Sequence, residues 1–125
     1  MVKTALVASE IEEGRKFLEL AEEAGFPVRA AMWKKEETPG RWSLLLVTPV
    51  EDEIGHMKTY MRLLKILTKS RERTTIELED LRPISPKSKF AKDLRRMFRP
   101  LKEQPVLFTP IGDQFIEDGY LYFAK

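Results

Sequence analysis

The sequence predicts an α+β fold, a single domain spanning residues 1–125 in which about three helices pack on one face of a mostly antiparallel sheet. The length suits one domain, and 42% hydrophobic residues are enough for one core. Helical and strand periodicities follow in the order α-β-β-α-β-α-β-β, which is not the regular alternation of a parallel α/β protein. No apolar run approaches the roughly 20 residues of a membrane span, so we expect a cytoplasmic protein with no membrane association.

Residues 9–25 are predicted to form the first helix, with an earlier start at Thr4 as an alternative. Ser9 and Glu12 have the spacing of a capping box. Gly25, followed by Phe26-Pro27, is a typical helix end. The apolar residues at helical spacing are Ile11, Phe17, Leu18, Ala21 and Ala24.

Residues 27–34 and 41–48 are predicted to pair as a β-hairpin around a turn at Pro39-Gly40. The second segment, RWSLLLVT, gives the strongest strand signal in the chain. Trp33 and Trp42 flank the turn end of this hairpin. We expect them to be exposed beside a sheet edge, which makes them candidates for a protein interface.

Residues 52–70 are predicted to form the second helix, in which two stripes run at helical spacing. The stripe expected to face the core contains Ile54, Met57, Tyr60, Met61, Leu64 and Leu67. The other stripe is basic and contains Lys58, Arg62, Lys65 and Lys69. Residues 74–78 alternate as a strand, which residues 82–84 extend past a bend at Glu79-Asp80.

Residues 86–98 are predicted to form the third helix, with Ser85 as its N-cap, Pro86 at its first position and Pro100 after its end. Its apolar face contains Phe90, Leu94, Met97 and Phe98. Its basic face contains Lys87, Lys89, Lys92, Arg95, Arg96 and Arg99.

The last part of the chain is predicted to form strands at 105–109 and 114–124. The second segment is either two strands about a hairpin turn at Asp118-Gly119 or one strand with a bulge there. Tyr120 and Tyr122 would share a strand face, where they could stack on a nucleic-acid base or pack across strands.

The segment TPVEDEIGH, residues 48–56, contains the most reactive-looking cluster of the sequence. Asp52, Glu53 and His56 are catalytic candidates as acid–base groups, and Glu51, Asp52 and Glu53 are candidate ligands of a hard metal ion. The alternative, which we favour, is a strand-to-helix junction. Thr48 and Glu51 then form a capping box, the acids lie at the positive end of the helix dipole, and His56 has no evident partner. We predict no cofactor and no metal.

The charge is segregated along the chain, although the net charge is only +2. Residues 1–53 have a net charge of −4, residues 54–102 of +9, and residues 103–125 of −3. Clustered cations favour anion or nucleic-acid binding by the basic faces of the second and third helices. The alternative is that both faces are simply hydrated. The absence of cysteine excludes disulfides and thiolate chemistry, and the absence of asparagine is a pattern seen in thermophile proteins or in compositional drift.

Four segments, AGFPVRAAMW, WSLLLVTPVEDEIG, LRPISPKSKFAKDLRR and IEDGYLY, carry a resemblance through most of the chain. They resemble a family of small uncharacterised bacterial proteins with the segments "AGFPV-AALW", "ATPLVDEEGP", "SP-DPLV-ALR" and "IEDAYIY". The family has no known activity, so the resemblance implies no catalytic residue. It implies proline at the position of His56, which argues against catalysis there, and a less basic start to the third helix.

We therefore predict a small binding or adaptor module without enzymatic activity that associates with itself or with a protein partner. Whether it is an enzyme is left open. The first alternative is a nucleic-acid-associated protein that uses the basic helices. The second is a hydrolase that depends on carboxylates or a metal ion.

Overall fold

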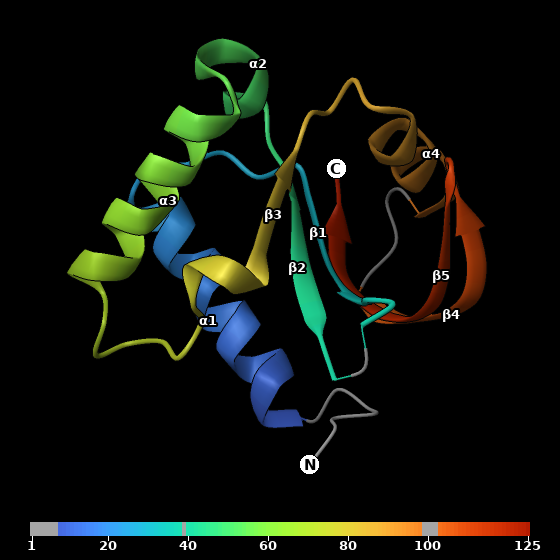
Figure 1. Ribbon diagram of the computed structural model, residues 1–125, viewed down its shortest axis with the longest axis horizontal. Helices are drawn as coiled ribbons and strands as arrows, with labels where there is room; N and C mark the ends of the chain where they lie inside the picture. Colours follow the sequence, from blue (N-terminus) through green and yellow to red (C-terminus); the bar gives the residue numbers. More distant parts are fainter. Residues whose placement is uncertain (1–7, 39, 99–102) are drawn as a thin grey trace.

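A five-stranded sheet with the strand order β3-β2-β1-β5-β4 lies at the centre of the protein (Figure 1). The structure, a computed structural model, describes residues 8–38, 40–98 and 103–125. The strands are β1 (Ala30–Lys35), β2 (Trp42–Val47), β3 (Leu81–Ile84), β4 (Gln104–Ile111) and β5 (Gln114–Ala124). Only β2 and β3 are parallel. The predicted α+β class with a mostly antiparallel sheet is confirmed.

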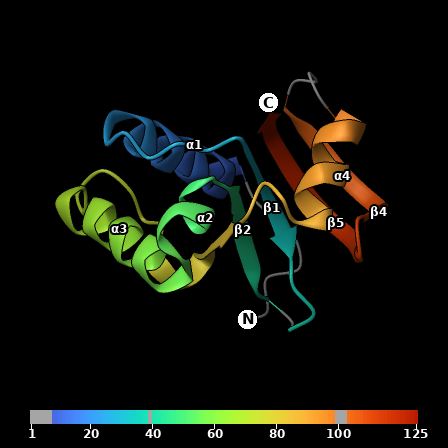
Figure 2. The same cartoon turned by 90° about the horizontal axis from the view of Figure 1, so that it is seen from above.

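The helices lie on both faces of this sheet, so the prediction that they share one face is wrong. They are α1 (Ala8–Glu23), α2 (Val50–Ile54), α3 (His56–Lys69), the short 3₁₀ helix η1 (Leu78–Asp80) and α4 (Lys89–Phe98). Helices α1 and α3 cover one face of β1 and β2, and α4 lies on the other side against β4 and β5 (Figure 2). The curved β4–β5 hairpin has an apolar inner side that needs its own cover, and α4 supplies it.

Two apolar cores result, one on each face of the sheet. In the first core, Phe17 of α1 and Leu63 of α3 pack against the sheet. In the second core, Phe90 and Leu94 of α4 pack against Ile116 of β5. Strand β2 serves both cores, because alternate side chains of WSLLLV point to opposite faces. This double burial explains the apolar run LLLV at residues 44–47.

Helix α1 ends as the sequence predicts. Gly25 has a φ of +73°, a left-handed conformation that glycine adopts without strain. The Phe26 N–H donates to the Ala21 carbonyl and the Gly25 N–H to the Glu22 carbonyl, as in a Schellman motif. The predicted cap at the other end is wrong, because Ser9 already lies within the helix. Thr4, the alternative start, lies outside the described residues.

The predicted β1–β2 hairpin is confirmed, but the expected exposure of its tryptophans is wrong. The exposed fraction is 3% for Trp33 and 4% for Trp42. Strand β5 lies beside β1 and β3 lies beside β2, so the hairpin is central and not at an edge. The Trp33 Nε1–H donates to the Tyr122 hydroxyl oxygen at 2.8 Å. Pro39, half of the predicted turn, lies outside the described residues.

The predicted helix 52–70 is two helices, because Gly55 interrupts it with φ +84° and ψ 166°. Helix α2 begins earlier than predicted, where the Thr48 Oγ1 accepts the Val50 N–H at 3.2 Å. The reciprocal capping box is wrong. The Thr48 N–H donates to the Ile84 carbonyl instead, and the Glu51 carboxylate lies against His56. The junction thus ties α2 to the parallel strand β3.

The segment between α3 and α4 differs from the prediction at two places. Residues 74–77 form no strand, and η1 leads directly into β3, where residues 82–84 are extended as predicted. Ser88 caps α4, since its Oγ accepts the Ala91 N–H at 3.1 Å. Ser85, the predicted cap, instead accepts the Lys87 N–H in the preceding turn.

Strand β5 is continuous, so the predicted turn at Asp118-Gly119 is wrong. The β4–β5 turn lies at Gly112-Asp113, where Gly112 has a φ of +61°. Gly119 serves close strand packing, because a Cβ there would lie 2.6 Å from the Trp33 carbonyl oxygen. A bulge does occur, but at Tyr122, which has no partner between the pairs Ala31–Phe123 and Met32–Leu121.

Proline occurs in both edge strands of the sheet. Strand β3 contains Pro83, and β4 contains Pro105 and Pro110. Because proline has no N–H to offer a further strand, these residues limit pairing with another chain at either edge.

Candidate functional site

Helix α3 contacts the sheet through residues that the sequence pattern only partly identified. Its buried residues are Thr59, Leu63, Ile66 and Leu67. The Tyr60 hydroxyl also donates to the Leu81 carbonyl of β3 at 2.9 Å. Of the predicted core stripe, only Tyr60 and Leu67 face the protein, so the prediction is wrong for the remainder.

That remainder forms an exposed apolar row, consisting of Ile54, Met57, Met61 and Leu64. Met57, Met61 and Leu64 follow one side of α3 at spacings of four and three residues, and Ile54 is the last residue of α2, just before Gly55. Met57 is 77% exposed and Met61 is 63% exposed. This row is the largest departure of the structure from the expected burial pattern.

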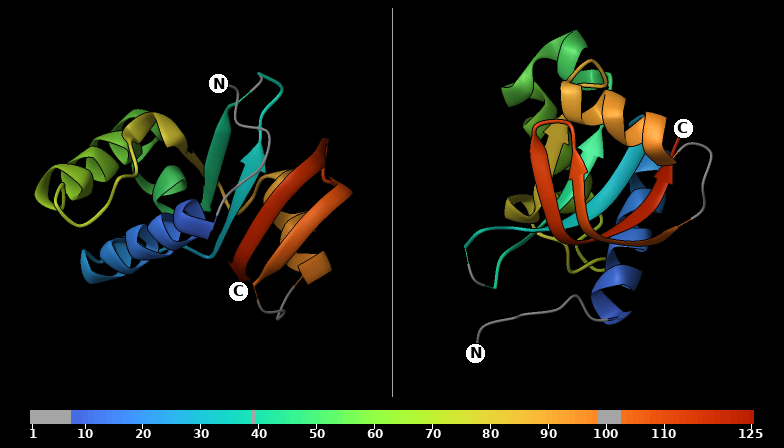
Figure 3. Two further views of the ribbon diagram at one scale, coloured as in Figure 1. Left: turned by 90° about the horizontal axis from the view of Figure 1, so that it is seen from below. Right: turned by 90° about the vertical axis from the view of Figure 1, so that its right-hand side faces the viewer.

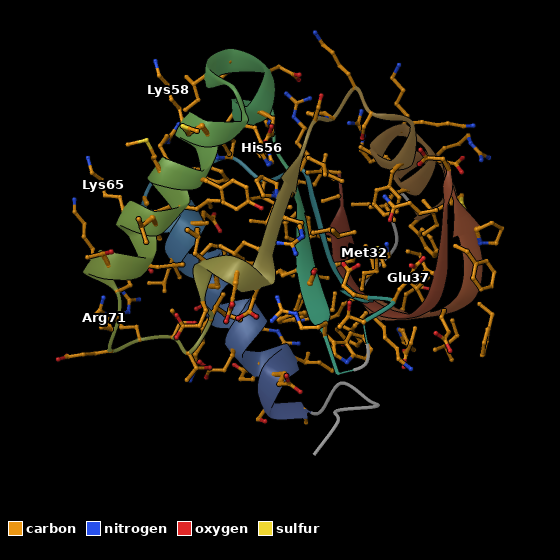
Figure 4. The ribbon with its side chains drawn as sticks, viewed as in Figure 1. Met32, Glu37, His56, Lys58, Lys65 and Arg71 are labelled. Carbon is orange, nitrogen blue, oxygen red and sulfur yellow. The ribbon has the colours of Figure 1, made fainter. Side chains whose placement is uncertain are left out.

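The predicted basic stripe, Lys58, Arg62, Lys65 and Lys69, lies next to the apolar row and is exposed. Lys58 and Lys65 extend away from the sheet (Figure 4). Helix α3 contains no aspartate or glutamate. In the part of the chain that the structure describes, Lys58, Lys65 and Lys69 make no hydrogen bond or ion pair, and Arg62 contacts only the ring of Phe26, at 5.2 Å. We call the row and the stripe together the α3 outer face.

The basic residues of α4 lie on the opposite side of the sheet, so the two predicted stripes do not form one surface (Figure 3). Lys87, Lys89, Lys92 and Arg96 line a shallow depression of about 400 Å³. Arg95 is half-buried and its Nη1 lies 3.4 Å from the Pro86 carbonyl. Arg99 lies outside the described residues.

Asp93 is the one acid in the α4 depression, and it is held by neighbouring groups. Its Oδ2 accepts the Gly112 N–H at 2.7 Å, and its Oδ1 pairs with Arg96. The Gly112 N–H and then the Arg96 guanidinium lower the pKa of Asp93. Asp93 therefore joins α4 to the β4–β5 turn.

The cluster Asp52, Glu53 and His56 is divided between two helices, because α2 ends at Ile54 and α3 begins at His56. The Ser85 Oγ donates to the Asp52 carboxylate at 2.9 Å. The expectation that His56 has no partner is also wrong, since its Nδ1 lies 2.7 Å from the Glu51 Oε1. Within residues 8–38, 40–98 and 103–125, no group of three or more His, Cys, Asp or Glu is placed to hold a metal ion.

A hydrogen-bond network that the sequence pattern did not indicate joins α1 to β5. The Glu103 carboxylate accepts the Tyr120 hydroxyl and the Arg15 Nη2, each at 2.5 Å. The Tyr120 hydroxyl and then Arg15 lower the pKa of Glu103. The bonded residues lie far apart in the chain, and no motif connects them.

Tyr122 lies beside this network and is buried. Its hydroxyl donates to the Ile11 carbonyl at 2.6 Å, and burial raises its pKa well above the ordinary value. The Tyr120 ring meets the Tyr122 ring edge-on at a centroid distance of 5.6 Å. The two tyrosines pack on each other and on the protein, as the packing alternative predicted.

No protein-family model, curated protein or solved structure matches this chain. The resemblance of the four sequence segments to a known family therefore stays a prediction. The proposed function is based on the α3 outer face. Among the helices that the structure describes, none is long and apolar enough to span a membrane.

Proposed function

We propose that the protein is a non-enzymatic binding module that docks an acidic segment of a partner protein on the α3 outer face. The observation that carries this proposal is the exposed apolar row Ile54, Met57, Met61 and Leu64. Single exposed apolar side chains are ordinary on protein surfaces, whereas a contiguous row marks an interaction site.

The apolar row supplies the driving force for docking. Full burial of a methionine or leucine side chain contributes about 1.5–3 kcal/mol. Two of the four residues are methionines, whose flexible side chains adapt to the shape of a partner. A helical partner segment could lie along the row and cover successive members of it.

The basic stripe specifies the charge of the partner. Lys58, Lys65 and Lys69 have no carboxylate partner in the described structure, so an acidic segment would meet uncompensated cations. A second copy docking α3 on α3 would bring four more cations and no carboxylate from that helix. The surface therefore favours a different, acidic protein, and self-association remains a separate prediction from the sequence.

A labelled peptide that forms an amphipathic helix of leucine and glutamate tests the proposal by fluorescence anisotropy. The double variant Met57→Ser/Met61→Ser should weaken binding by about tenfold or more, because two buried anchors are lost. The matched control is Leu107→Ser/Phe108→Ser, which removes two exposed apolar side chains of β4 and should leave binding unchanged.

Single-stranded RNA is the second probe, because the cations would attract phosphates without any need for the apolar row. Steeply salt-dependent RNA binding with no peptide binding would replace the proposal with the nucleic-acid alternative. Equal peptide affinity of the Met57→Ser/Met61→Ser variant and the wild type would also overturn it.

A further inference from the structure

An open groove of about 560 Å³ lies between the C-terminal halves of α1 and α3. Its apolar lining consists of Leu20 of α1, Ala24 just after α1 and Ile66 of α3. Small-molecule sites have volumes of roughly 300–1,000 Å³ and a mostly apolar lining with a few polar groups. The groove lies within this volume range, and three of its nine lining residues are apolar.

Four cations and one acid line the same groove. The acid, Glu23, is paired with Arg73, whose Nη2 lies 2.9 Å from the Glu23 Oε2 and whose Nη1 lies 3.5 Å from the Oε1. Glu23 is thus neutralised within the lining. Arg62, Lys65 and Lys69 remain without a carboxylate partner in the structure described for the chain.

The helix ends at this groove oppose an anion only weakly. The C-terminal end of a helix carries partial negative charge on its last carbonyl groups. Here the N–H groups of Gly25 and Phe26 bond the last carbonyls of α1, and the Ser70 N–H bonds the Ile66 and Leu67 carbonyls of α3. The three unpaired side-chain cations therefore dominate the local field.

From this arrangement we infer that the groove binds a small organic acid with an apolar body, such as a medium-chain carboxylate. The acid group would meet Arg62, Lys65 and Lys69, and the apolar body would cover Leu20, Ala24 and Ile66. A neutral molecule of the same shape would leave the cations unpaired, and a cationic one would be repelled. The ligand is a small molecule, so the inference goes beyond the docking of a partner protein.

Three eight-carbon probes that differ in charge test the inference, namely octanoate, octanol and octyltrimethylammonium. Titration followed by backbone ¹H–¹⁵N chemical shifts also locates the site. Octanoate should give saturable shifts at Leu20, Ala24 and Ile66. The affinity for each of the other two probes should be lower by about tenfold or more. Shifts of equal size with octanol would overturn the inference.

Charge reversal supplies matched variants. Lys65→Glu/Lys69→Glu should weaken octanoate binding by about tenfold or more, since two attractions become repulsions. The control variant Lys87→Glu/Lys92→Glu makes the same change in net charge at the α4 depression and should leave the affinity for octanoate unchanged. Unchanged affinity in the first variant, or binding only to vesicles of anionic phospholipid, would overturn the inference.

The variant Met57→Ser/Met61→Ser separates this site from the proposed function. It should keep its affinity for octanoate even though it loses the acidic peptide. Octanoate binding without peptide binding in the wild type would refute the docking of a partner protein and leave the groove as a ligand site. Peptide binding without octanoate binding would refute only the inferred ligand site in the groove.

Discussion

Replacing Gly14 by alanine should destabilise the protein, although alanine is the better helix former. Gly14 lies buried in α1, facing β1 and β5. A Cβ atom at this position would lie 2.2 Å from the Tyr122 hydroxyl oxygen and 2.8 Å from the Trp33 Nε1. Both distances are too short for a carbon atom, so the tyrosine would have to move.

The free energy change follows from what that movement breaks. Alanine in place of glycine gains about 1 kcal/mol in helix propensity. The displaced Tyr122 hydroxyl loses its hydrogen bond to Ile11, about 1 kcal/mol, and leaves the Trp33 N–H unsatisfied, which costs about 1–3 kcal/mol. The expected result is a net loss of about 1–3 kcal/mol in the free energy of unfolding.

Urea denaturation followed by tryptophan fluorescence measures this loss. The control is Tyr122→Phe, which removes the obstructing oxygen and both hydrogen bonds at once. In that background, Gly14→Ala should cost at least about 1 kcal/mol less than it does in the wild type. A wild-type protein that gains about 1 kcal/mol from Gly14→Ala, as at an exposed helix position, would refute the reasoning.

Two further predictions concern Phe108 of β4 and Asp93 of α4. Phe108→Gly should stabilise the protein by up to about 1 kcal/mol in urea denaturation, because Phe108 has a φ of +47° and is 69% exposed. Phe108→Ala keeps the strain and should show no such gain. Asp93→Asn should lower stability at pH 7 and should lower it less at low pH. The lowered pKa of Asp93 means that its contribution is present above the ordinary value of 3.8 and is lost as the pH falls through the folded-state pKa. Unfolding measured at pH 7 and pH 3 checks this, and an equal effect of Asp93→Asn at both would contradict it.

Local signals in the sequence were enough for the features that depend on local physics. Gly25 ends α1 because the chain there needs a residue in the left-handed conformation. Glycine directly after a helical segment predicts such an end in any sequence. The hairpin β1–β2 needs only a short turn and two apolar strands. The fold class followed from the order of such elements.

Features decided by distant contacts could not be predicted in this way. Gly119 follows an aspartate and so matches a hairpin turn, yet it is required by the approach of β1. The tryptophans are buried because they belong to the first core, where α1 packs on the sheet. Neither contact can be inferred from the local sequence pattern.

In the candidate site too, distant contacts decided what the local sequence pattern could not predict. Two apolar stripes run along residues 54–67, and both have helical spacing. The sequence favoured the stripe with Met57 and Met61, whereas the sheet accepts the one with Leu63 and Ile66. The basic stripe was predicted correctly as an exposed face, because lysine at that spacing is costly to bury.

Strand β5, the last strand in the sequence, lies inside the sheet between β4 and β1, the first strand. During synthesis on the ribosome, the edge of β1 that pairs with β5 therefore stays unpaired while most of the chain emerges. Unlike the outer strands of the finished sheet, AAMWKK has no proline to prevent intermolecular pairing during that interval. The nascent chain is thus most vulnerable to aggregation before residues 114–124 arrive, and a chaperone that shields β1 would protect it at the critical stage.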